Sequence, residues 1–459
     1  MGKMFNKVAY DNLSDFVFGK AVHPVTLKNG MVIGGGKVYP EVNFTLPTMT
    51  ISKETMPEVI RHYKEMITGI CERAKELGEK DGFVAEIETL PPLTFNPDWG
   101  TEVCKTVVDV IKEYDAKYGV KGAVRITPND NREGKELDHM YKGKQWADLM
   151  KTFESCANVG ADLLSVESLG GKETHDEAVM FCDLPKVIFA LSVIGCNDMN
   201  KLWTEVANIA GRTGAIAAGD TACGFANTAM VLAGKNYIPG VFGAVVRVIA
   251  SVRSIVAYEC GAQGPDKDCG YEGVYLKAIT GRPISMEGRV AACAHLSHVG
   301  NIASCLCDLW SNESTPNIML LGGMAPTVSY EQLMYDCRLM NQAHAKGKDA
   351  ALLLRDLNAD SDSKLDPHAY ILRPDVVLDI AKEMVKVDGY YPRAKKAASA
   401  TLAHMKKGYD SGKLNLNEKE VQWLGDLAET VDKMPADVGE FTESIIDDCE
   451  NLDPKKYDM

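Results

Sequence analysis

Three segments of the chain combine acids or cysteines with glycines that turn the backbone. The first, Leu163 to Gly171, reads LLSVESLGG, so an apolar run ends in an acid and then turns. The second, Ala215 to Met230, reads AIAAGDTACGFANTAM, and the third, Gly261 to Gly273, reads GAQGPDKDCGYEG. Polar residues beside such turns are typical of sites built on loops. The candidate site residues are Glu167, Asp220, Cys223, Asp268, Cys269 and Glu272.

One subset of these residues has the chemistry of a zinc site. Thiolates and carboxylates bind zinc, and three protein ligands with one open position are typical of a catalytic centre. Glu167, Cys223 and Cys269 come from three separate segments and form one candidate ligand set. Simpler interpretations remain: a carboxylate bonded to turn amides for Glu167, an inert buried thiol for Cys223 and a surface thiol for Cys269. Asp220 can cap a helix or orient a ligand.

Two other pairs contain metal-binding residue types. His295 and His298 form an HxxH pattern, and Cys305 and Cys307 are two residues apart. Residues two apart lie on different sides of a helix, and an HxxH pair on an apolar helix more often serves packing or local hydrogen bonds. No CxxC motif occurs in the chain. We therefore favour the three-segment set over both pairs.

Short apolar runs alternate with helical patterns along the first three quarters of the chain. This alternation predicts a mainly parallel sheet covered by helices. The expected strands are Phe83–Ile87, Gly122–Ile126, Leu163–Val166, Val187–Val193, Ala215–Ala218 and Asn317–Leu321. The expected helices are Thr55–Leu77, Glu102–Tyr118, Trp146–Asn158, Met199–Gly211 and the long apolar Gly243–Cys260.

A closed (β/α)8 barrel and an open doubly wound sheet both produce this alternation. An open sheet usually binds a nucleotide through a glycine-rich turn, but no GxGxxG opens a helix here, and Gly34–Gly36 with Lys37 do not meet the P-loop spacing. We therefore predict an α/β fold, a (β/α)8 TIM-type barrel with its active site at the carboxyl ends of the strands.

Helical patterns dominate from about Val328 onward. We predict two parts: residues 1–327 as the barrel with an N-terminal segment, and residues 328–459 as a helical C-terminal extension packed on the barrel or a partner. The helices expected there are Tyr330–Ala345, Pro374–Val387, Pro392–Lys406, Glu418–Val431 and Val438–Asn451.

Composition excludes several partners. The 64 acidic and 50 basic residues give a formal net charge of −14, which repels nucleic acid and anionic membrane surfaces. The longest apolar stretch, Val241 to Ala257, contains Arg247 and Arg253, so it predicts a buried helix rather than a membrane span. The first residues show no signal-peptide pattern, and 13 cysteines then indicate a reducing cytoplasm.

The motifs LLSVESLGGKE, GDTACGFANTAM, GPDKDCGYEG, KAITGRP and CDLWSNES resemble the methanol:corrinoid methyltransferases of methanogenic archaea and acetogenic bacteria. The resemblance covers most of the chain and is densest from Leu163 to Ser314. It implies a (β/α)8 barrel with one zinc ion per chain. Carried over residue by residue, it implies Glu167, Cys223 and Cys269 as the zinc ligands.

The resemblance also implies a reaction, the transfer of the methyl group of methanol to cob(I)alamin. Zinc would act as a Lewis acid on the methanol oxygen. Asp220, Asp268 and Glu272 are the candidate proton donors, chosen only by their proximity in sequence to the expected ligands. The corrinoid would come from a separate protein docked at the barrel mouth. The nearest match to a DxHxxG cobalamin motif, Asp366–Ile371, lacks the glycine, so we expect no cofactor-binding residues for cobalamin in this chain. A homodimer that carries corrinoid subunits is expected.

Two alternatives stay open. The segments Cys293–Asn301 and Gly322–Val328 are less like the family, so the methyl donor can be another alcohol or a methoxylated compound. A barrel that only binds a corrinoid protein without catalysis is the second alternative, although a scaffold has no need of an open metal site.

Overall fold

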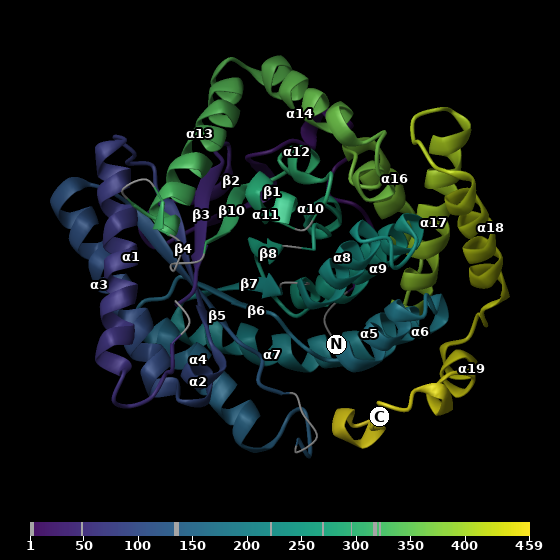
Figure 1. Cartoon of the computed structure of the whole chain (residues 1–459), viewed down its shortest axis with the longest axis horizontal. Helices are drawn as coiled ribbons and strands as arrows, with labels where there is room; N and C mark the ends of the chain where they lie inside the picture. Colours follow the sequence, from purple (N-terminus) through teal and green to yellow (C-terminus); the bar gives the residue numbers. More distant parts are fainter. Residues whose placement is uncertain are drawn as a thin grey trace.

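The computed structural model describes residues 4–46, 49–132, 137–220, 223–268, 270–294, 296–314, 319–320 and 323–459. Its centre is an eight-stranded sheet ringed by helices (Figure 1). The strands pair in parallel in the order β7-β6-β5-β4-β3-β10-β9-β8. They are β3 (Tyr39–Phe44), β4 (Phe83–Thr89), β5 (Gly122–Pro128), β6 (Leu163–Val166), β7 (Ile216–Asp220), β8 (Asp266–Asp268), β9 (Ile284–Glu287) and β10 (Leu309–Ser314).

The two ends of this strand order meet. The backbone N–H of Gln263, just before β8, donates a 2.7 Å hydrogen bond to the carbonyl of Ala217 in β7. The sheet is therefore a nearly closed barrel, and the prediction of a (β/α)8 fold is confirmed. Two small antiparallel hairpins accompany it, β1 (Lys20–Thr26) with β2 (Val32–Gly35) and β11 (Met319–Leu320) with β12 (Gly323–Met324).

Helices cover the outside of the barrel and its rim. The longer ones around the strands are α1 (Met56–Glu76), α3 (Pro97–Tyr118), α4 (Gly143–Val159), α7 (Cys196–Thr213), α9 (Gly240–Glu259) and α13 (Ala325–Ala345). The shorter ones are α2 (Pro91–Phe95), α5 (Lys172–Met180), α6 (Leu184–Phe189), α8 (Thr228–Gly234), α10 (Gly273–Thr280), α11 (Arg289–Ala294) and α12 (Gly300–Ala303). Two π-helical segments, η2 (Ala190–Gly195) and η3 (Cys223–Asn227), and a 3-10 turn, η1 (Leu13–Asp15), complete this part.

Helix α9 is the apolar stretch that the sequence singled out. It is the one helix of the described residues long and apolar enough to cross a membrane, yet all its residues from Val241 to Glu259 are buried. Its inner side faces the barrel, and α17 (Tyr390–Asp410) and α18 (Glu418–Lys433) pack on its outer side (Figure 1). A helix covered all round has no polar face, so the interpretation as a buried helix is confirmed.

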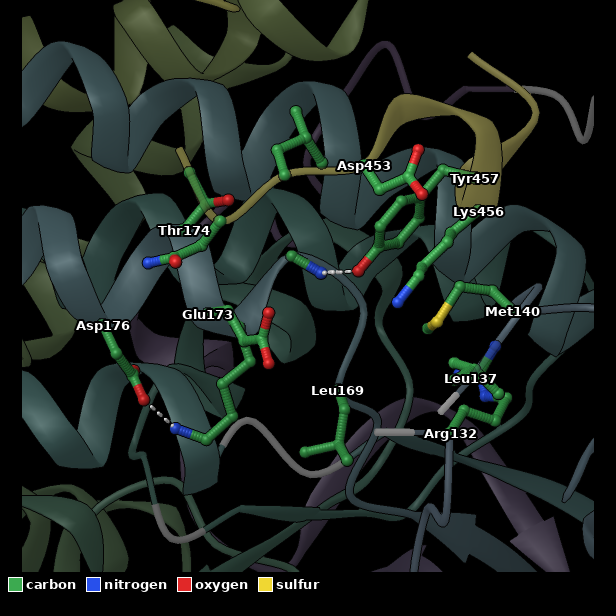
Figure 2. Close-up of a pocket in the computed structure, with 14 residues that line it drawn as sticks. Arg132, Leu137, Met140, Leu169, Glu173, Thr174, Asp176, Asp453, Lys456 and Tyr457 are labelled. Carbon is green, nitrogen blue, oxygen red and sulfur yellow. Dashed lines mark hydrogen bonds and ion pairs between the residues drawn. The ribbon is translucent and has the colours of Figure 1, made fainter. Parts of the chain in front are cut away.

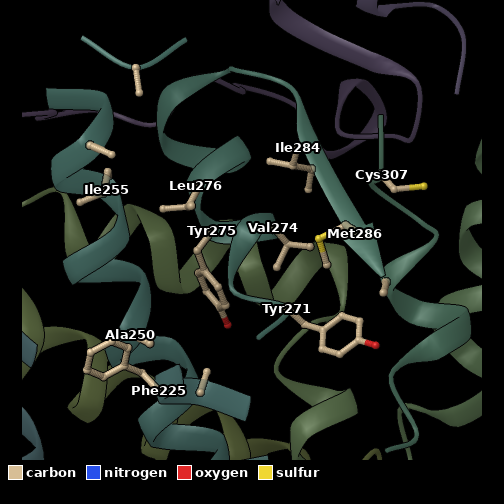
Figure 3. Packing of buried hydrophobic residues seen from close by; sticks show 14 of the residues in the cluster. Phe225, Ala250, Ile255, Tyr271, Val274, Tyr275, Leu276, Ile284, Met286 and Cys307 are labelled. Carbon is tan, nitrogen blue, oxygen red and sulfur yellow. The ribbon is translucent and has the colours of Figure 1, made fainter. Parts of the chain in front are cut away.

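The core continues from α9 into α10 and β9. Figure 3 shows Ile255 of α9, Tyr275 and Leu276 of α10 and Ile284 of β9 among the buried side chains of this region. The phenol of Tyr275 donates a 2.6 Å hydrogen bond to the carbonyl of Ile371, which ties this core to the C-terminal helices. A buried tyrosine hydroxyl needs such a partner.

Charged side chains occupy the inside of the barrel. Arg125 of β5 donates to Glu41 Oε1 of β3 at 2.6 Å and to Ser165 Oγ of β6 at 2.7 Å. Lys267 of β8 donates to Glu88 Oε1 of β4 at 2.5 Å. Because β4 and β8 are four places apart in the strand order, this last pair spans the barrel.

The polar interior explains the strands that the sequence analysis missed. The segments of β3, β8, β9 and β10 read YPEVNF, DKD, ISME and LWSNES, none of which is a continuous apolar run. Buried parallel strands usually are such runs. Here charged side chains point into the barrel and pair with each other, so polar residues interrupt the apolar runs of these strands.

Two expected strands are wrong. Val187–Val193 belongs to α6 and η2, because Asp183 caps that helix at the backbone N–H of Lys186 and a proline follows the cap. Periodicity cannot separate a short apolar run in a strand from one in a helix. Of Asn317–Leu321, only Met319–Leu320 lies within the described residues, and it forms the hairpin strand β11 rather than a barrel strand.

The C-terminal part is helical. It contains α14 (Lys348–Asp362), α15 (Pro367–Tyr370), α16 (Pro374–Met384), α17, α18, α19 (Val438–Glu443) and the 3-10 turns η4 (Ile446–Asp448) and η5 (Pro454–Tyr457). Residue 328, the predicted start of the extension, lies inside α13. This helix packs on β3, β10 and α1, as a barrel helix does. We therefore propose that the extension begins after Ala345.

Candidate active site

Glu167 follows β6 directly and extends its pairing through an isolated bridge with Asn129. Its carboxylate lies beside the segment that begins at Cys223. A Cβ built on Gly224 would lie 3.2 Å from Glu167 Oε1 and 3.2 Å from Lys172 Cε. Only a residue without a side chain leaves both groups in place, so Gly224 gives the Glu167 carboxylate its room.

The two cysteines of the predicted set stand at neighbouring strand ends. The backbone of Cys223 opens η3, three positions after Asp220 ends β7, and its side chain is outside what the structure describes. Cys269 comes directly after Asp268, the last residue of β8, and lies outside the described residues. The segment η3 is a π-helical turn, a form that occurs frequently at functional sites.

These positions support the candidate ligand set. The strands β6, β7 and β8 are neighbours in the barrel, and they run parallel, so their carboxyl ends meet at one edge. Glu167, Cys223 and Cys269 therefore follow three adjacent strand ends. Among the residues that the structure describes, no three His, Cys, Asp or Glu side chains gather as a metal would require, so the ligand set stays a prediction.

Asp220 is buried at the end of β7 and carries two strong contacts on one oxygen. Its Oδ2 accepts hydrogen bonds from Arg253 Nη1 at 2.8 Å and from Ser168 Oγ at 3.0 Å. Its other oxygen, Oδ1, is buried and has no hydrogen-bond partner among the described residues. Burial raises the pKa of Asp220, while Arg253 and Ser168 act against that rise.

The other two predicted proton donors differ in what the structure says of them. Asp268 ends β8, and its side chain is outside the description. Glu272 is buried between β8 and α10, where its Oε1 accepts a 3.2 Å hydrogen bond from Ser254 Oγ of α9. Glu272 thus joins the loop after Cys269 to the helix behind the site.

The rival metal pairs do not form sites in the described residues. Cys305 and Cys307 are fully buried, and each thiol bonds to a backbone carbonyl, of Arg355 at 3.1 Å and of Ser304 at 3.5 Å. Burial raises the pKa of both thiols, so they stay protonated. His295 lies outside the described residues, and His298 is exposed.

A cavity of about 190 Å³ adjoins the loop after Glu167. Figure 2 shows Asp176 on one side of it and Tyr457 on another. Asp176 pairs with Lys172, and the Tyr457 hydroxyl accepts a 3.2 Å hydrogen bond from the backbone N–H of Gly171. The turn η5 therefore forms one wall of this cavity, next to the loop between β6 and α5. The lining residues that carry charge are Arg132, Lys172, Glu173, Asp176, Asp453 and Lys456.

Sequence reasoning missed two charged residues near the site. Arg253 was noted only because it interrupts an apolar stretch, and Lys267 was not singled out. Both are buried, and a buried charge is costly unless it is paired. A basic residue within an apolar segment was the signal that could have marked Arg253, whereas Lys267 lies between two acids in β8 and had no such signal.

The fold is a nearly closed α/β barrel, and the candidate site residues follow the carboxyl ends of β6, β7 and β8. A family model described as the methanol-cobalamin methyltransferase B subunit matches residues 2–458. The chain is 39% identical over 453 residues to the methanol–corrinoid protein co-methyltransferase of Methanosarcina barkeri strain Fusaro, which covers 97% of this chain and 95% of the relative.

Structural comparison agrees. The crystal structure of the methanol:cobalamin methyltransferase complex MtaBC from Methanosarcina barkeri is similar with a TM-score of 0.94 and 36% identity, over 100% of both chains. The chain therefore belongs to the methanol-cobalamin methyltransferase B subunit family. This confirms the resemblance, the barrel and the prediction that the protein is a methyltransferase.

Proposed function

We propose that this protein transfers the methyl group of methanol to the cob(I)alamin of a separate corrinoid protein, with zinc held by Glu167, Cys223 and Cys269. The family match over residues 2–458 carries the proposal. The relative's name includes both methanol and a corrinoid protein, and the similar crystal structure is described as a complex.

One described side chain, that of Glu167, supports a zinc ion at this site. Glu167 supplies a carboxylate oxygen beside the turn where Cys223 begins, and Gly224 leaves that oxygen free of a neighbouring Cβ. Two thiolates and one carboxylate around Zn²⁺ form a three-ligand set that leaves a fourth position for substrate. When bound, zinc would supply a Lewis acid for the methanol oxygen.

The side chains of this protein must recognise methanol and supply the proton. Methanol has only two heavy atoms and therefore offers little binding energy, so a small polar site with fixed groups has to recognise it. Asp220 is a candidate to give a proton to the departing oxygen through Oδ1, the atom that Arg253 and Ser168 leave unbonded. Asp268 and Glu272 are the other two candidates.

Three further statements belong to this proposal. The corrinoid protein docks at the mouth of the barrel, because the strand ends that carry the site open there. The enzyme is a homodimer within that complex. It works in the cytoplasm, where its thiols stay reduced, and the eleven cysteines of the described part of the chain are all free.

Metal content tests the zinc site. We expect about one zinc per chain in the wild type, and little in Cys223→Ala and Cys269→Ala. Cys260→Ala is the matched control, since Cys260 is a partly buried free thiol at the end of α9, bonded to the carbonyl of Asn200. A wild type that stays zinc-free after repletion, yet methylates the corrinoid protein, would contradict the proposal.

A donor screen tests the substrate. The absorption change from cob(I)alamin to methylcob(III)alamin reports each turnover on a purified corrinoid protein. We expect methanol to be the active donor. If methanol is inert while another alcohol or a methoxylated compound works, the alternative donor replaces it. Binding of the corrinoid protein with no turnover from any donor would favour a scaffold.

A further inference from the structure

One fully buried arginine joins the strand ends that carry the proposed zinc ligands. Arg253 lies in the middle of α9, and its side chain has no exposed surface. Its Nη1 donates to Asp220 Oδ2 at 2.8 Å, and its Nη2 donates to Ser168 Oγ at 2.5 Å and to the Ser168 carbonyl at 3.2 Å. The two arms of the guanidinium therefore reach two different strand ends.

These partners stand next to the ligands in the chain. Ser168 follows Glu167 directly, and Asp220 is three positions before Cys223. The guanidinium also lies 4.1 Å from the ring of Phe225, which is two positions after Cys223. One side chain thus contacts the residue after the first ligand and residues on both sides of the second.

The contacts close into a ring. Ser168 Oγ, which accepts from Arg253, itself donates to the same Asp220 oxygen at 3.0 Å. The end of β6, the end of β7 and the guanidinium therefore form one connected set of hydrogen bonds. A change in one member shifts the other two, because Asp220 Oδ2 and Ser168 Oγ each take part in two of these hydrogen bonds.

Only an arginine can make this set. Its planar guanidinium offers several N–H donors in fixed directions, whereas a lysine places one ammonium at one point. The helix η2 also makes room for it: a Cβ built on Gly195 would lie 2.9 Å from Arg253 Cδ. Its burial between η2, η3 and the strand ends leaves the guanidinium one orientation.

We propose that Arg253 is a positioning residue of the metal site, which holds Glu167 and the Cys223 turn at the separation that zinc requires. The proposal rests on the proposed function, since it assumes those ligands. Arg253 acts through its contacts with Ser168, Asp220 and Phe225.

Zinc affinity, measured by competition with a chromophoric chelator, tests this role. We expect Arg253→Met to bind zinc about 10- to 100-fold more weakly than the wild type, as is typical when a group behind a metal ligand is lost. Arg253→Lys should fall between the two, because an ammonium can reach Asp220 or Ser168 but not both.

Arg393→Met is the matched control. Arg393 is also fully buried and pairs with a carboxylate of α9, Glu259, at 3.0 Å. Its loss removes the same kind of ion pair, but the other hydrogen bonds of Arg393 and Glu259 go to Phe5 and Tyr390 rather than to Ser168 or Asp220. We expect a comparable loss of thermal stability and a zinc affinity unchanged from the wild type.

A spectroscopic measurement separates geometry from stability. The cobalt(II)-substituted protein reports the ligand arrangement through its visible absorption bands. We expect altered bands in Arg253→Met and wild-type bands in Arg393→Met. If Arg253→Met does not fold, Ser168→Ala replaces it, since this variant removes one hydroxyl of the ring and leaves the guanidinium in place.

The outcomes are distinct. Wild-type zinc affinity and cobalt bands in Arg253→Met or Ser168→Ala would overturn the positioning role and leave the proposed function intact. An equal loss of affinity in Arg393→Met would also overturn it, because the effect would then be one of stability alone. Absence of zinc from the repleted wild type would overturn both the proposed function and this role.

Discussion

Replacing Gly224 by alanine should raise the stability of the protein and weaken zinc binding at the proposed metal site. Gly224 lies in the helical turn η3, and its backbone has no left-handed φ, so alanine fits there without backbone strain. Glycine costs roughly 0.5–1 kcal/mol relative to alanine inside a helix. On conformational grounds alone, the variant should gain that amount.

The new methyl group meets two neighbours. It would lie 3.2 Å from Glu167 Oε1, about 0.2 Å inside ordinary van der Waals contact, and 3.2 Å from Lys172 Cε. Lys172 is a flexible side chain whose ammonium pairs with Asp176, so it can move aside. Glu167 cannot move without leaving its proposed ligand position, and we expect zinc affinity to fall about tenfold, or ~1.4 kcal/mol.

The assay measures both quantities on one sample. Thermal unfolding of the metal-free protein gives stability, and chelator competition gives zinc affinity. Gly425→Ala is the control: Gly425 lies in α18 with nothing within 4 Å of its built Cβ, so it should gain stability and leave zinc binding unchanged. Equal zinc affinity in the two variants would refute the reasoning that Gly224 makes room for the Glu167 carboxylate.

Two further predictions concern charges inside the barrel. Arg125→Met should lower the free energy of unfolding by about 3–5 kcal/mol in a urea titration, because it leaves Glu41 buried without its ion-pair partner; a loss below about 1 kcal/mol would contradict this. Burial, opposed by Lys267, raises the pKa of Glu86 to about 7 from its usual 4.5. Between these two pH values the folded protein therefore keeps a proton on Glu86 that the unfolded chain releases. As the pH rises from 4.5 to 7, the free energy of unfolding of the wild type should fall relative to that of Glu86→Gln. Parallel stability curves for the two proteins would refute that pKa shift.

The sequence indicated the positions of the candidate site better than its contacts. Glu167 and Asp220 each stand at the end of a strand, and a strand end beside a glycine turn is visible in the chain. Arg253 could not be assigned in the same way. Its partners Asp220 and Ser168 are 33 and 85 positions away, and no local pattern connects them.

The same limit applied to the strands. Apolar runs marked β4, β5, β6 and β7, but β8 reads Asp266-Lys267-Asp268 and has no strand signal of its own. It is a strand through its pairing with β9, and Lys267 contacts Glu88 on the far side of the barrel, which offsets the cost of burying its charge. Such a pair exists only once the barrel has formed.

The sequence by itself determined the longer barrel helices α1, α3, α4 and α7, since an amphipathic period is a local property. It also determined the alternation that requires a barrel, and the motifs that place the family. Tertiary structure decided which apolar run becomes a strand, which charges are paired, and how the ends of β6 and β7 are joined through α9. These depend on contacts between residues far apart in the chain, and their energies come from burial and charge pairing that no local segment can supply.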